Sequence, residues 1–339
     1  MKPLVSLGLA VSAVLLLRRI ARPRRFYFSR RVAMISGGAR GLGLGVAREL
    51  ARRGAKLALF SRSKIELDAA REEFERAGVR VAVRVCDVRD AVAVRDAVAA
   101  FEAELGPIDV VVNVAGVIEV GPIDALTLAD YRDAVDTNLF GGIHTVEAVR
   151  ERMMRRREGR IVNITSLGAK IPIPHLLPYT VSKFAFLGYS EGLRTELARY
   201  GIVVTTIVPG LMRTGSPPQA TFAGQTKKEY AMFAPSDSLP FTSVSVETAA
   251  RDIADACERG EVERVISWQA RAAILAYAFL PRTTVRFLAT ATRLLPDAGG
   301  STEHRPGAES ESPLTAPGSP LTAAMDRAAV TQHERLDPA

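Results

Sequence analysis

The chain has little of what would build a disulfide-linked or metal-centred protein. Its 339 residues include only two cysteines and four histidines. Cys86 and Cys257 lie far apart without a pairing pattern, and the histidines show no metal-ligand spacing. A disulfide framework and a metal site are therefore not expected, and the cysteine usage fits a reducing compartment. The hydrophobic fraction of 47% and the charged fraction of 24% are those of an ordinary globular domain.

Acidic residues are absent from the first 31 positions, where eight basic side chains account for the net charge of +8. Without those eight, the basic side chains number 37, equal to the acidic ones. The remainder of the chain is therefore neutral, and a basic surface that would bind nucleic acid is not expected on it.

An apolar run over residues 3–17 precedes the arginines of this N-terminal arm. It is shorter than the roughly 20 residues that a membrane-spanning helix needs. The charge follows the run, and no small-residue cleavage site separates it from the rest, which disfavours a cleaved signal peptide. We therefore predict an uncleaved anchor or inserted hook over residues 1–29, with the rest on the cytoplasmic face of a membrane. A loosely packed N-terminal helix and a cleaved signal are the alternatives.

Short apolar segments alternate with longer helical ones from Arg31 onward. Strands are expected at 31–36, 56–60, 80–85, 109–113, 160–165, 202–208 and 262–267, with helices near 41–53, 64–77, 91–104, 127–157, 177–200 and 246–259. Continuous apolar runs such as Val110–Val112 favour parallel strands covered on both faces. The alternation predicts an α/β fold over residues 30–268, with a doubly wound parallel sheet of Rossmann type in three layers, α/β/α.

Two further segments follow this predicted domain. Residues 269–296 contain no acidic side chain, and Pro281 should divide them into two short helices. Three arginines share one face of the second helix, namely Arg282, Arg286 and Arg293. This basic amphipathic helical extension suits an anionic membrane surface, although packing on the domain or on a sister subunit explains it equally well. Residues 297–339 are rich in Pro, Ser, Thr, Gly and Ala, which predicts disorder.

A glycine-rich segment, Ser36–Gly43, lies between the first predicted strand and the first helix. Its spacing is Gly-x3-Gly-x-Gly. Glycines permit a tight turn and let backbone N–H groups approach a phosphate, to which the helix N-terminus adds a partial positive charge. In this context the segment predicts a dinucleotide site rather than a plain turn.

The end of the second strand indicates which dinucleotide is bound. The segment Ser61-Arg62-Ser63 has no carboxylate of the kind that holds the adenosine ribose of NAD. Two arginines are available instead, Arg40 in the glycine-rich turn and Arg62 after the strand. A guanidinium can bind a ribose 2′-phosphate through two hydrogen bonds, so the residues favour NADP(H) over NAD(H).

Tyr179 and Lys183 stand four residues apart at the start of a predicted helix and therefore share a face. Ser166 lies just beyond the preceding strand. A phenol is a poor base at neutral pH, but a nearby ammonium lowers its pKa. Tyr179 can then exchange a proton with a carbonyl oxygen as hydride is transferred, while Ser166 binds that oxygen. The pattern predicts interconversion of a carbonyl and an alcohol.

Taken together, these motifs resemble the short-chain dehydrogenase/reductase family, in its compact single-domain branch with Gly-x3-Gly-x-Gly and Tyr-x3-Lys. The resemblance implies a catalytic set of Asn138, Ser166, Tyr179 and Lys183, with Asn138 in a proton relay. It implies a cofactor-binding set of Ser36, Gly37, Ala39, Arg40, Gly41, Leu42, Gly43, Ser61, Arg62, Asp87, Val88, Asn113, Ala115, Gly116, Tyr179, Lys183, Pro209, Gly210 and Thr214. It also implies a homodimer or homotetramer. Val114 departs from the family's Asn-Asn-Ala-Gly, and we expect only a small stability cost from it.

The segment between the last two predicted strands bears on the substrate. Residues 212–245 should form a lid with six large apolar or aromatic side chains: Phe222, Tyr230, Met232, Phe233, Leu239 and Phe241. They either line an apolar pocket or pack against one another. With the predicted anchor and basic helix, they favour a lipid-like ketone or alcohol. A catalytically idle nucleotide-binding or membrane-tethered regulator would lack part of the catalytic set. An epimerase or dehydratase would show different glycine spacing.

Overall fold

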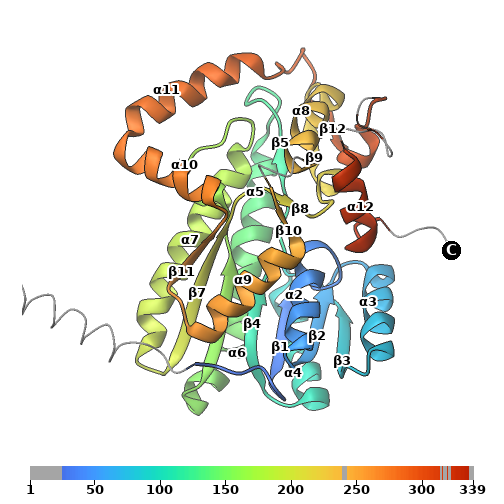
Figure 1. The fold of residues 1–339 in the computed structure, drawn as a ribbon, viewed down its shortest axis with the longest axis vertical. Coiled ribbons are helices and arrows are strands. Elements are labelled where there is room, and N and C mark those ends of the chain that lie inside the picture. The colour runs from blue at the N-terminus through green and yellow to red at the C-terminus, as the bar shows by residue number, and fades with distance from the viewer. Residues whose placement is uncertain (1–24, 239–242, 314, 316–318, 320–321, 336–339) are drawn as a thin grey trace, which may run out of the picture.

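A seven-stranded parallel sheet forms the centre of the structure, a computed structural model that describes residues 25–238, 243–313, 315, 319 and 322–335 (Figure 1). The strand order is β11-β7-β6-β4-β1-β2-β3. The strands are β1 (Val32–Ser36), β2 (Lys56–Ser61), β3 (Val81–Val85), β4 (Ile108–Asn113), β6 (Gly159–Ile164), β7 (Ile202–Pro209) and β11 (Glu263–Ile266). Each end lies within one residue of its predicted position, so the doubly wound parallel sheet is confirmed.

Helices cover both faces of this sheet and complete the three predicted layers. One face carries α2 (Gly41–Arg52), α3 (Lys64–Arg76) and α9 (Val246–Arg259), and the other carries α4 (Ala91–Leu105), α6 (Gly141–Arg156) and α7 (Leu177–Ala198). In β1, Ala33 and Ile35 pack into the first layer, while Val32 and Met34 pack into the second. This is the alternation of side chains expected along a strand buried on both sides.

The strand order reverses at β1, and this reversal positions the site. The chain passes from β1 to β2 and β3 in one direction, and from β4 to β6, β7 and β11 in the other. In open α/β sheets a crevice for ligands forms beyond the carboxyl ends of the strands at such a reversal.

The long helix predicted over residues 127–157 is interrupted. It consists of α5 (Leu128–Val135), a π-helical turn η1 (Asp136–Phe140) and α6. A π-helical turn is wider than an α-helical one and is often found at functional sites. Here it carries Asn138, whose side chain is buried.

Small elements cover the carboxyl ends of the central strands. They include a three-stranded sheet in the order β12-β9-β5. Its strands are β5 (Glu119–Val120), β9 (Thr221–Ala223) and β12 (His304–Pro306). Beside it lie β8 (Met212–Arg213), which pairs with β10 (Val244–Ser245), and the helix α8 (Thr226–Ser238). The predicted lid is therefore largely regular structure.

The extension after β11 forms two helices, as predicted, with Pro281 at the break. They are α10 (Trp268–Phe279) and α11 (Pro281–Ala291), and a 3₁₀ turn, η4 (Thr292–Leu294), follows. Both helices project beside α7 and arch over the upper part of the molecule (Figure 1). Of their large apolar side chains, several are mostly exposed, including Trp268, Phe279 and Phe287.

The prediction that residues 297–339 are disordered is wrong for the part of them that the structure describes. This part contains β12, a 3₁₀ turn, η5 (Gly307–Glu309), and the helix α12 (Ala323–Thr331). Met325 is fully buried in a cluster with Phe222 and Tyr230 of the lid. The composition of the tail concealed this order because its burial comes from contacts with a distant part of the chain.

The predicted N-terminal anchor lies mostly outside the described residues. Its last residues belong to the folded domain, because Phe26 and Phe28 are buried in the core. The Phe26 N–H also donates to the Glu258 carbonyl at 2.9 Å. The domain therefore includes Phe26 and Phe28, and its predicted start at residue 30 was too late. Within the described ranges, every helix is too short or too polar to cross a membrane.

Candidate active site

One cavity of about 600 Å³ opens beyond the carboxyl ends of the strands and collects most of the predicted site. The predicted residues that line it are Gly37, Arg40, Leu42, Gly43, Ser61, Arg62, Asp87, Val88, Ala115, Gly116, Ser166, Tyr179, Lys183, Pro209, Gly210 and Thr214. They lie at or after the ends of β1, β2, β3, β4, β6 and β7, or in the first two turns of a helix that follows. Parallel strands bring these separate segments together, since their carboxyl ends meet at one edge of the sheet.

The glycine-rich turn has a backbone that larger residues would not fit. Gly37 has a φ of 67°, and a Cβ there would come within 3.0 Å of the Ala115 backbone. A Cβ at Gly43 would clash with the Gly37 carbonyl oxygen. Helix α2 begins directly after this turn without a side-chain hydrogen bond from its N-cap residue, Arg40. The turn and the helix N-terminus therefore form the kind of cradle that binds a phosphate.

Five predicted residues do not line the cavity: Ser36, Ala39, Gly41, Asn113 and Asn138. The Ser36 hydroxyl accepts hydrogen bonds from the N–H groups of Val114 and Ala115, at 3.1 and 3.3 Å. It therefore fixes the chain as it leaves β4. Ala39 is fully buried behind the turn.

Asn113 serves the sheet rather than the cavity. Its amide donates to the Asn163 side chain at 2.9 Å, and its oxygen accepts a hydrogen bond from Thr145. All three side chains are buried. The network therefore links β4, β6 and α6, and it fixes the strand end from which Ala115 and Gly116 reach the cavity.

Two cationic side chains lie at the adenosine end of the predicted cofactor site. Arg62 is exposed at the edge of the cavity. Arg40 pairs with Glu66 at 3.0 Å and with Glu334 at 3.3 Å. Burial raises the pKa of the Glu334 carboxyl to about 7, although Arg40 acts in the opposite direction.

Asp87, a member of the implied cofactor-binding set, also lines this end of the cavity. Its carboxylate accepts hydrogen bonds from the Arg89 backbone at 2.9 Å and from the Arg89 guanidinium. Burial raises the pKa of Asp87, but these bonds outweigh burial and hold the pKa below its ordinary value. Asp87 is therefore a fixed anion at the end of β3.

Lys183 lies at the opposite end, beside Tyr179. Its ammonium is buried, donates to the Ile164 carbonyl at 3.2 Å and lies 5.7 Å from the centre of the Tyr179 ring. Burial lowers the pKa of Lys183 to about 8. A cation held this close to a phenol favours the phenolate and so lowers the cost of removing its proton.

Ser166 is held by the short 3₁₀ turn η2 (Leu167–Ala169), which it caps. Its hydroxyl oxygen accepts the Gly168 N–H at 3.1 Å, and its own O–H remains able to donate into the cavity. A Cβ on Gly168 would lie 3.4 Å from the Tyr179 ring, so that ring packs against the same turn. Ser166, Tyr179 and Lys183 therefore lie in one small region.

Asn138 stands behind this region, where the π-helical turn places it. Its oxygen accepts the Val117 N–H at 2.8 Å, and its amide donates to the Val117 carbonyl at 3.1 Å and to Ser182 at 2.9 Å. It thereby fixes the segment that follows β4. A Cβ on Gly116 would meet both the Asn138 oxygen and the Lys183 ammonium, so the two groups flank the same glycine.

Several residues that line the cavity were not predicted from the sequence, among them Ile173, Leu176, Gln219 and Glu334. Phe233 was predicted as a lid residue and does line the cavity. The other described lid side chains are arranged differently, because Phe222 and Tyr230 are fully buried against one another and Met232 is about half exposed. Leu239 and Phe241 lie outside the described residues. Glu334 lies in the C-terminal tail, and no sequence motif indicated that it lines the cavity.

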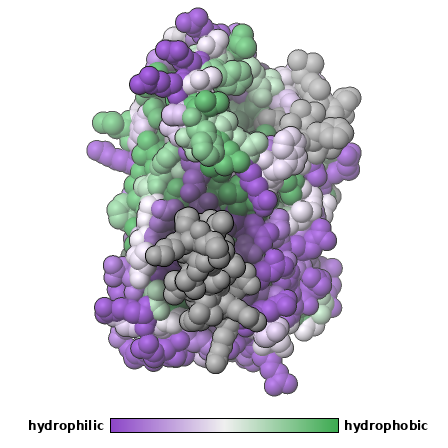
Figure 2. All heavy atoms as spheres, turned by 60° about the vertical axis from the view of Figure 1, so that its left-hand side comes forward, coloured by the Kyte–Doolittle hydropathy of each residue, from purple (hydrophilic) through white to green (hydrophobic). Residues whose placement is uncertain are grey.

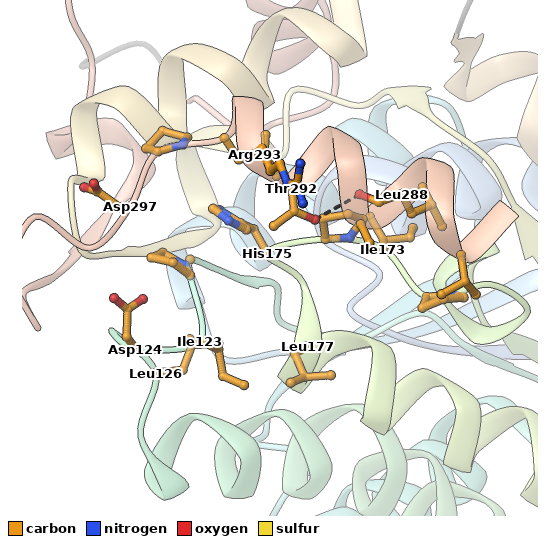
Figure 3. Close-up of a pocket in the computed structure, with 18 residues that line it drawn as sticks. Ile123, Asp124, Leu126, Ile173, His175, Leu177, Leu288, Thr292, Arg293 and Asp297 are labelled. Carbon is orange, nitrogen blue, oxygen red and sulfur yellow. Dashed lines mark hydrogen bonds between the residues drawn. The ribbon is translucent and has the colours of Figure 1, made fainter. Parts of the chain in front are cut away.

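A second cavity, of about 640 Å³, lies beneath α11 (Figure 3). Leu288 and Arg293 approach it from the extension, while Ile123, Ile173 and Leu177 approach from the domain (Figure 3). Ile173 lines both cavities. The two spaces are therefore neighbours, separated in part by one apolar side chain.

Comparison with known proteins agrees with this architecture. The model of the short chain dehydrogenase family matches residues 31–221. The gluconate 5-dehydrogenase of Gluconobacter oxydans is 35% identical over 195 residues, which cover 58% of this chain and 76% of the relative. The D-threitol dehydrogenase of Mycolicibacterium smegmatis is 36% identical over 194 residues, covering 56% and 73%.

Solved structures give the same result. An actinorhodin polyketide ketoreductase variant with NADPH matches at a TM-score of 0.63 and 30% identity, covering 70% of this chain and 95% of the other. A gluconate 5-dehydrogenase from Burkholderia cenocepacia, in complex with NADP and tartrate, matches at 0.61 and 28% identity, covering 73% and 98%. The chain therefore belongs to the short-chain dehydrogenase/reductase family of oxidoreductases.

Proposed function

We propose that the chain is an NADP(H)-dependent oxidoreductase that interconverts a carbonyl and an alcohol, with Tyr179 as the proton donor and acceptor. One observation carries the proposal. Tyr179, Lys183 and Ser166 line the same cavity as a glycine-rich turn at a helix N-terminus. A nicotinamide cofactor in this cavity would supply or accept the hydride.

The chain's own residues have distinct roles in this proposal. Tyr179 gives its phenolic proton to the carbonyl oxygen in reduction and removes it in oxidation. Lys183 stabilises the phenolate through its charge and binds the nicotinamide ribose. Ser166 donates a hydrogen bond to the substrate oxygen and stabilises the charge that develops on it. Asn138 holds the segment beside Lys183 and belongs to the proposed proton relay.

The preference for NADP(H) rests on the adenosine end of the cavity. Arg40 and Arg62 line it, and Ser61 and Ser63 stand where an NAD-binding protein would hold a carboxylate. The two solved relatives with NADPH and NADP support the same choice. Arg62→Ala should weaken NADPH binding about tenfold while leaving NADH binding unchanged, as measured by fluorescence titration.

The apolar character of the space near Tyr179 supports an apolar substrate. Ile173, Leu176 and Phe233 line the main cavity, and the neighbouring cavity beneath α11 is lined chiefly by apolar side chains. A ketone or alcohol with a hydrocarbon chain can place its oxygen at Tyr179 and its chain toward α11. We therefore propose a lipid-like substrate.

The extension supports membrane association of the protein. Trp268, Phe279 and Phe287 are 72%, 79% and 70% exposed, and residues 267–296 include four arginines and no acid. Figure 2 shows a broad apolar area on the part of the surface that includes this extension. Apolar side chains beside basic ones suit the surface of an anionic bilayer. We therefore propose that α10 and α11 rest on the cytoplasmic face of a membrane.

Flotation with liposomes tests the membrane proposal. Wild-type protein should float with vesicles that contain anionic lipid, and the double variant Arg282→Glu/Arg286→Glu should float markedly less. The control is Arg71→Glu/Arg76→Glu, which changes the same charge on exposed α3. Equal flotation of both variants and wild type would rule out a contribution from α11.

An oligomer is proposed on the basis of the family and of apolar side chains on two long helices. Val181 and Phe184 of α7 are 43% and 41% exposed, and Phe140, which directly precedes α6, is 44% exposed. A homodimer or homotetramer would cover them. Light scattering of the purified chain measures the assembly directly, and a monomer at micromolar concentration would contradict the proposal.

A kinetic experiment tests the proposed reaction. Ketones of increasing chain length are supplied with NADPH, and turnover is followed by the loss of nicotinamide absorbance. Tyr179→Phe should lower kcat about 10²–10⁴-fold with little change in nucleotide binding. Tyr27→Phe, at an exposed tyrosine, is the control and should retain activity. Nucleotide binding without turnover on any ketone or alcohol would favour a nucleotide-binding regulator instead.

A further inference from the structure

The C-terminal segment after α12 returns to the glycine-rich turn. The Gln332 carbonyl accepts a hydrogen bond of 2.7 Å from the Gly41 N–H. Gly41 is the first residue of α2, and the N–H groups at a helix N-terminus lack partners within the helix. These are the groups that bind phosphates in dinucleotide-binding proteins. A carbonyl from the chain's own tail therefore already uses one of them.

Glu334 places its carboxyl group at the same position. Its side chain is only 5% exposed, and its carboxylate lies 3.3 Å from Arg40. A Cβ on Gly41 would clash with that carboxylate, so the carboxylate lies against the turn itself. Glu334 also lines the main cavity together with Gly37, Arg40 and Gly43. In its ionised form, this carboxyl is an anion at a helix N-terminus beside an arginine, which is the chemistry of a bound phosphate.

The tail is held in this place by bonds along its length. Arg48 of α2 donates to the Thr331 carbonyl at 2.9 Å and to the Gln332 side chain at 3.1 Å. Gln332 donates to Glu247 of α9 at 2.9 Å, and Gln219 donates to the Glu334 carbonyl at 2.9 Å. At the other end of α12, Met325 is buried in the lid. The tail therefore has a defined docking site on α2, α9 and the lid.

From these contacts we infer that residues 332–334 are an internal occupant of the phosphate-binding end of the cavity, which a nicotinamide nucleotide must displace. The inference rests on the proposed function. One N–H cannot donate fully to two acceptors, and a carboxylate and a phosphate repel each other at one arginine. Bound tail and bound nucleotide are therefore alternatives. The apparent nucleotide affinity equals the intrinsic affinity multiplied by the fraction of molecules whose tail is released.

Linkage makes this competition reciprocal. A nucleotide that displaces the tail must promote tail release, just as tail release promotes nucleotide binding. Release would also loosen the contact of α12 with the lid, since Met325 packs beside Phe222 and Tyr230. Tail release thereby couples the adenosine end of the cavity to the cover over its catalytic end.

NADPH titration of full-length variants, followed by nucleotide fluorescence, tests the inference. The titration is done at pH 8, where Glu334, with a pKa of about 7, is mostly ionised. Glu334→Gln keeps the shape of the side chain and removes this charge, and it should bind NADPH about two- to fivefold more tightly than wild type, the range expected for one ion pair. The control Glu309→Gln changes an exposed glutamate of the same tail and should match wild type.

A second pair of variants changes α12 at side chains that do not line the main cavity. Met325→Ala removes the buried anchor of α12 and leaves a cavity, which weakens docking of the tail by several times the thermal energy. NADPH binding should therefore tighten about tenfold or more. Val330→Ala, on the 49% exposed side chain of the same helix, should change nothing. In wild type, NADPH should also increase hydrogen exchange in residues 323–335.

The outcomes separate the inference from the proposed function on which it rests. Unchanged NADPH affinity in both Glu334→Gln and Met325→Ala would overturn the inference alone. Weaker binding in both would also overturn it, because the tail would then hold the nucleotide rather than compete with it. If neither wild type nor any variant binds NADPH or NADH, the proposed function and the inference fail together.

Discussion

The sheet-and-helix body and the C-terminal segment use apolar side chains in opposite ways. In the body, Phe60 and Phe101 are fully buried and their rings lie 6.4 Å apart. In the extension, Phe279 and Phe287 are 79% and 70% exposed. Burial stabilises a fold in proportion to the apolar area removed from water. The body's aromatic residues therefore maintain the fold, and those of the extension are available for a partner surface.

The tail after the extension differs from both. It contacts the body mainly through polar groups, such as Arg48, Gln219 and the Gly41 N–H, and it buries only a few apolar side chains. A segment with little apolar burial opens at a lower free-energy cost than a core strand. One chain therefore joins a well-packed site to a segment that is held to it mainly by polar contacts.

The largest effect should come from an aromatic core residue of the body. Phe101→Ala leaves a cavity between α4 and the sheet, and it should lower the free energy of unfolding by about 3–5 kcal/mol. Phe279→Ala, on the exposed face of α10, should change it by less than about 0.5 kcal/mol. Urea unfolding followed by circular dichroism measures both. Similar losses for the two variants would mean that the extension packs as the core does.

The next effect concerns catalysis, and it is expected from Lys183→Met. The replacement keeps an unbranched apolar side chain in a buried site, so the protein should fold, but the cation beside Tyr179 is lost. We expect kcat to fall about 100-fold or more. Lys64→Met, at an exposed lysine on α3, serves as the control. Retained activity in Lys183→Met would exclude the proposed role of its ammonium.

Glu119, in the sheet that joins the tail to the lid, should make stability depend on pH. Burial raises the pKa of its carboxyl to about 8, with smaller contributions from Asp133 and Asp130. Its pKa in the unfolded chain is near 4.5, so the folded state binds more protons between these values and loses stability as pH rises toward 8. Above pH 8 the full cost of a buried carboxylate is present.

Glu119→Gln removes that cost and should be the more stable form at alkaline pH. We expect it to exceed wild type by about 1–3 kcal/mol at pH 9 and to match it near pH 4.5. Thermal unfolding at the two pH values measures the difference. Glu75→Gln, at an exposed position of α3, should show no such dependence. A constant difference between Glu119→Gln and wild type across pH would contradict the expected titration.

The smallest effect should come from the turn that leaves β4. Ser36→Ala removes the acceptor for the Val114 and Ala115 N–H groups. We expect a loss of about 1 kcal/mol in the free energy of unfolding, the usual size for such hydrogen bonds. Ser301→Ala, at a hydroxyl in the tail that accepts one backbone N–H, should cost less because that site is exposed to water.

The central sheet was predictable because its signals are local. A buried parallel strand is mostly apolar, and a glycine lies at or up to three residues before the start of most of these strands, so the strand boundaries were found within one residue. The catalytic set was predictable for a related reason. Tyr179 and Lys183 lie four apart on one helix, and the glycine-rich turn is continuous in the chain, so spacing alone places their groups together.

Features that depend on contacts between distant residues became visible only in the fold. Asn138 is aimed inward by a π-helical turn, Phe222 and Tyr230 pack with each other, and Phe233 faces the cavity. Glu334 reaches Arg40, almost 300 positions earlier in the chain. The composition of the tail gave no sign of this contact, because the buried surface and the hydrogen bonds that order it belong to α2, α9 and the lid. Local sequence determined the scaffold and its chemistry, and packing decided what lies over the site.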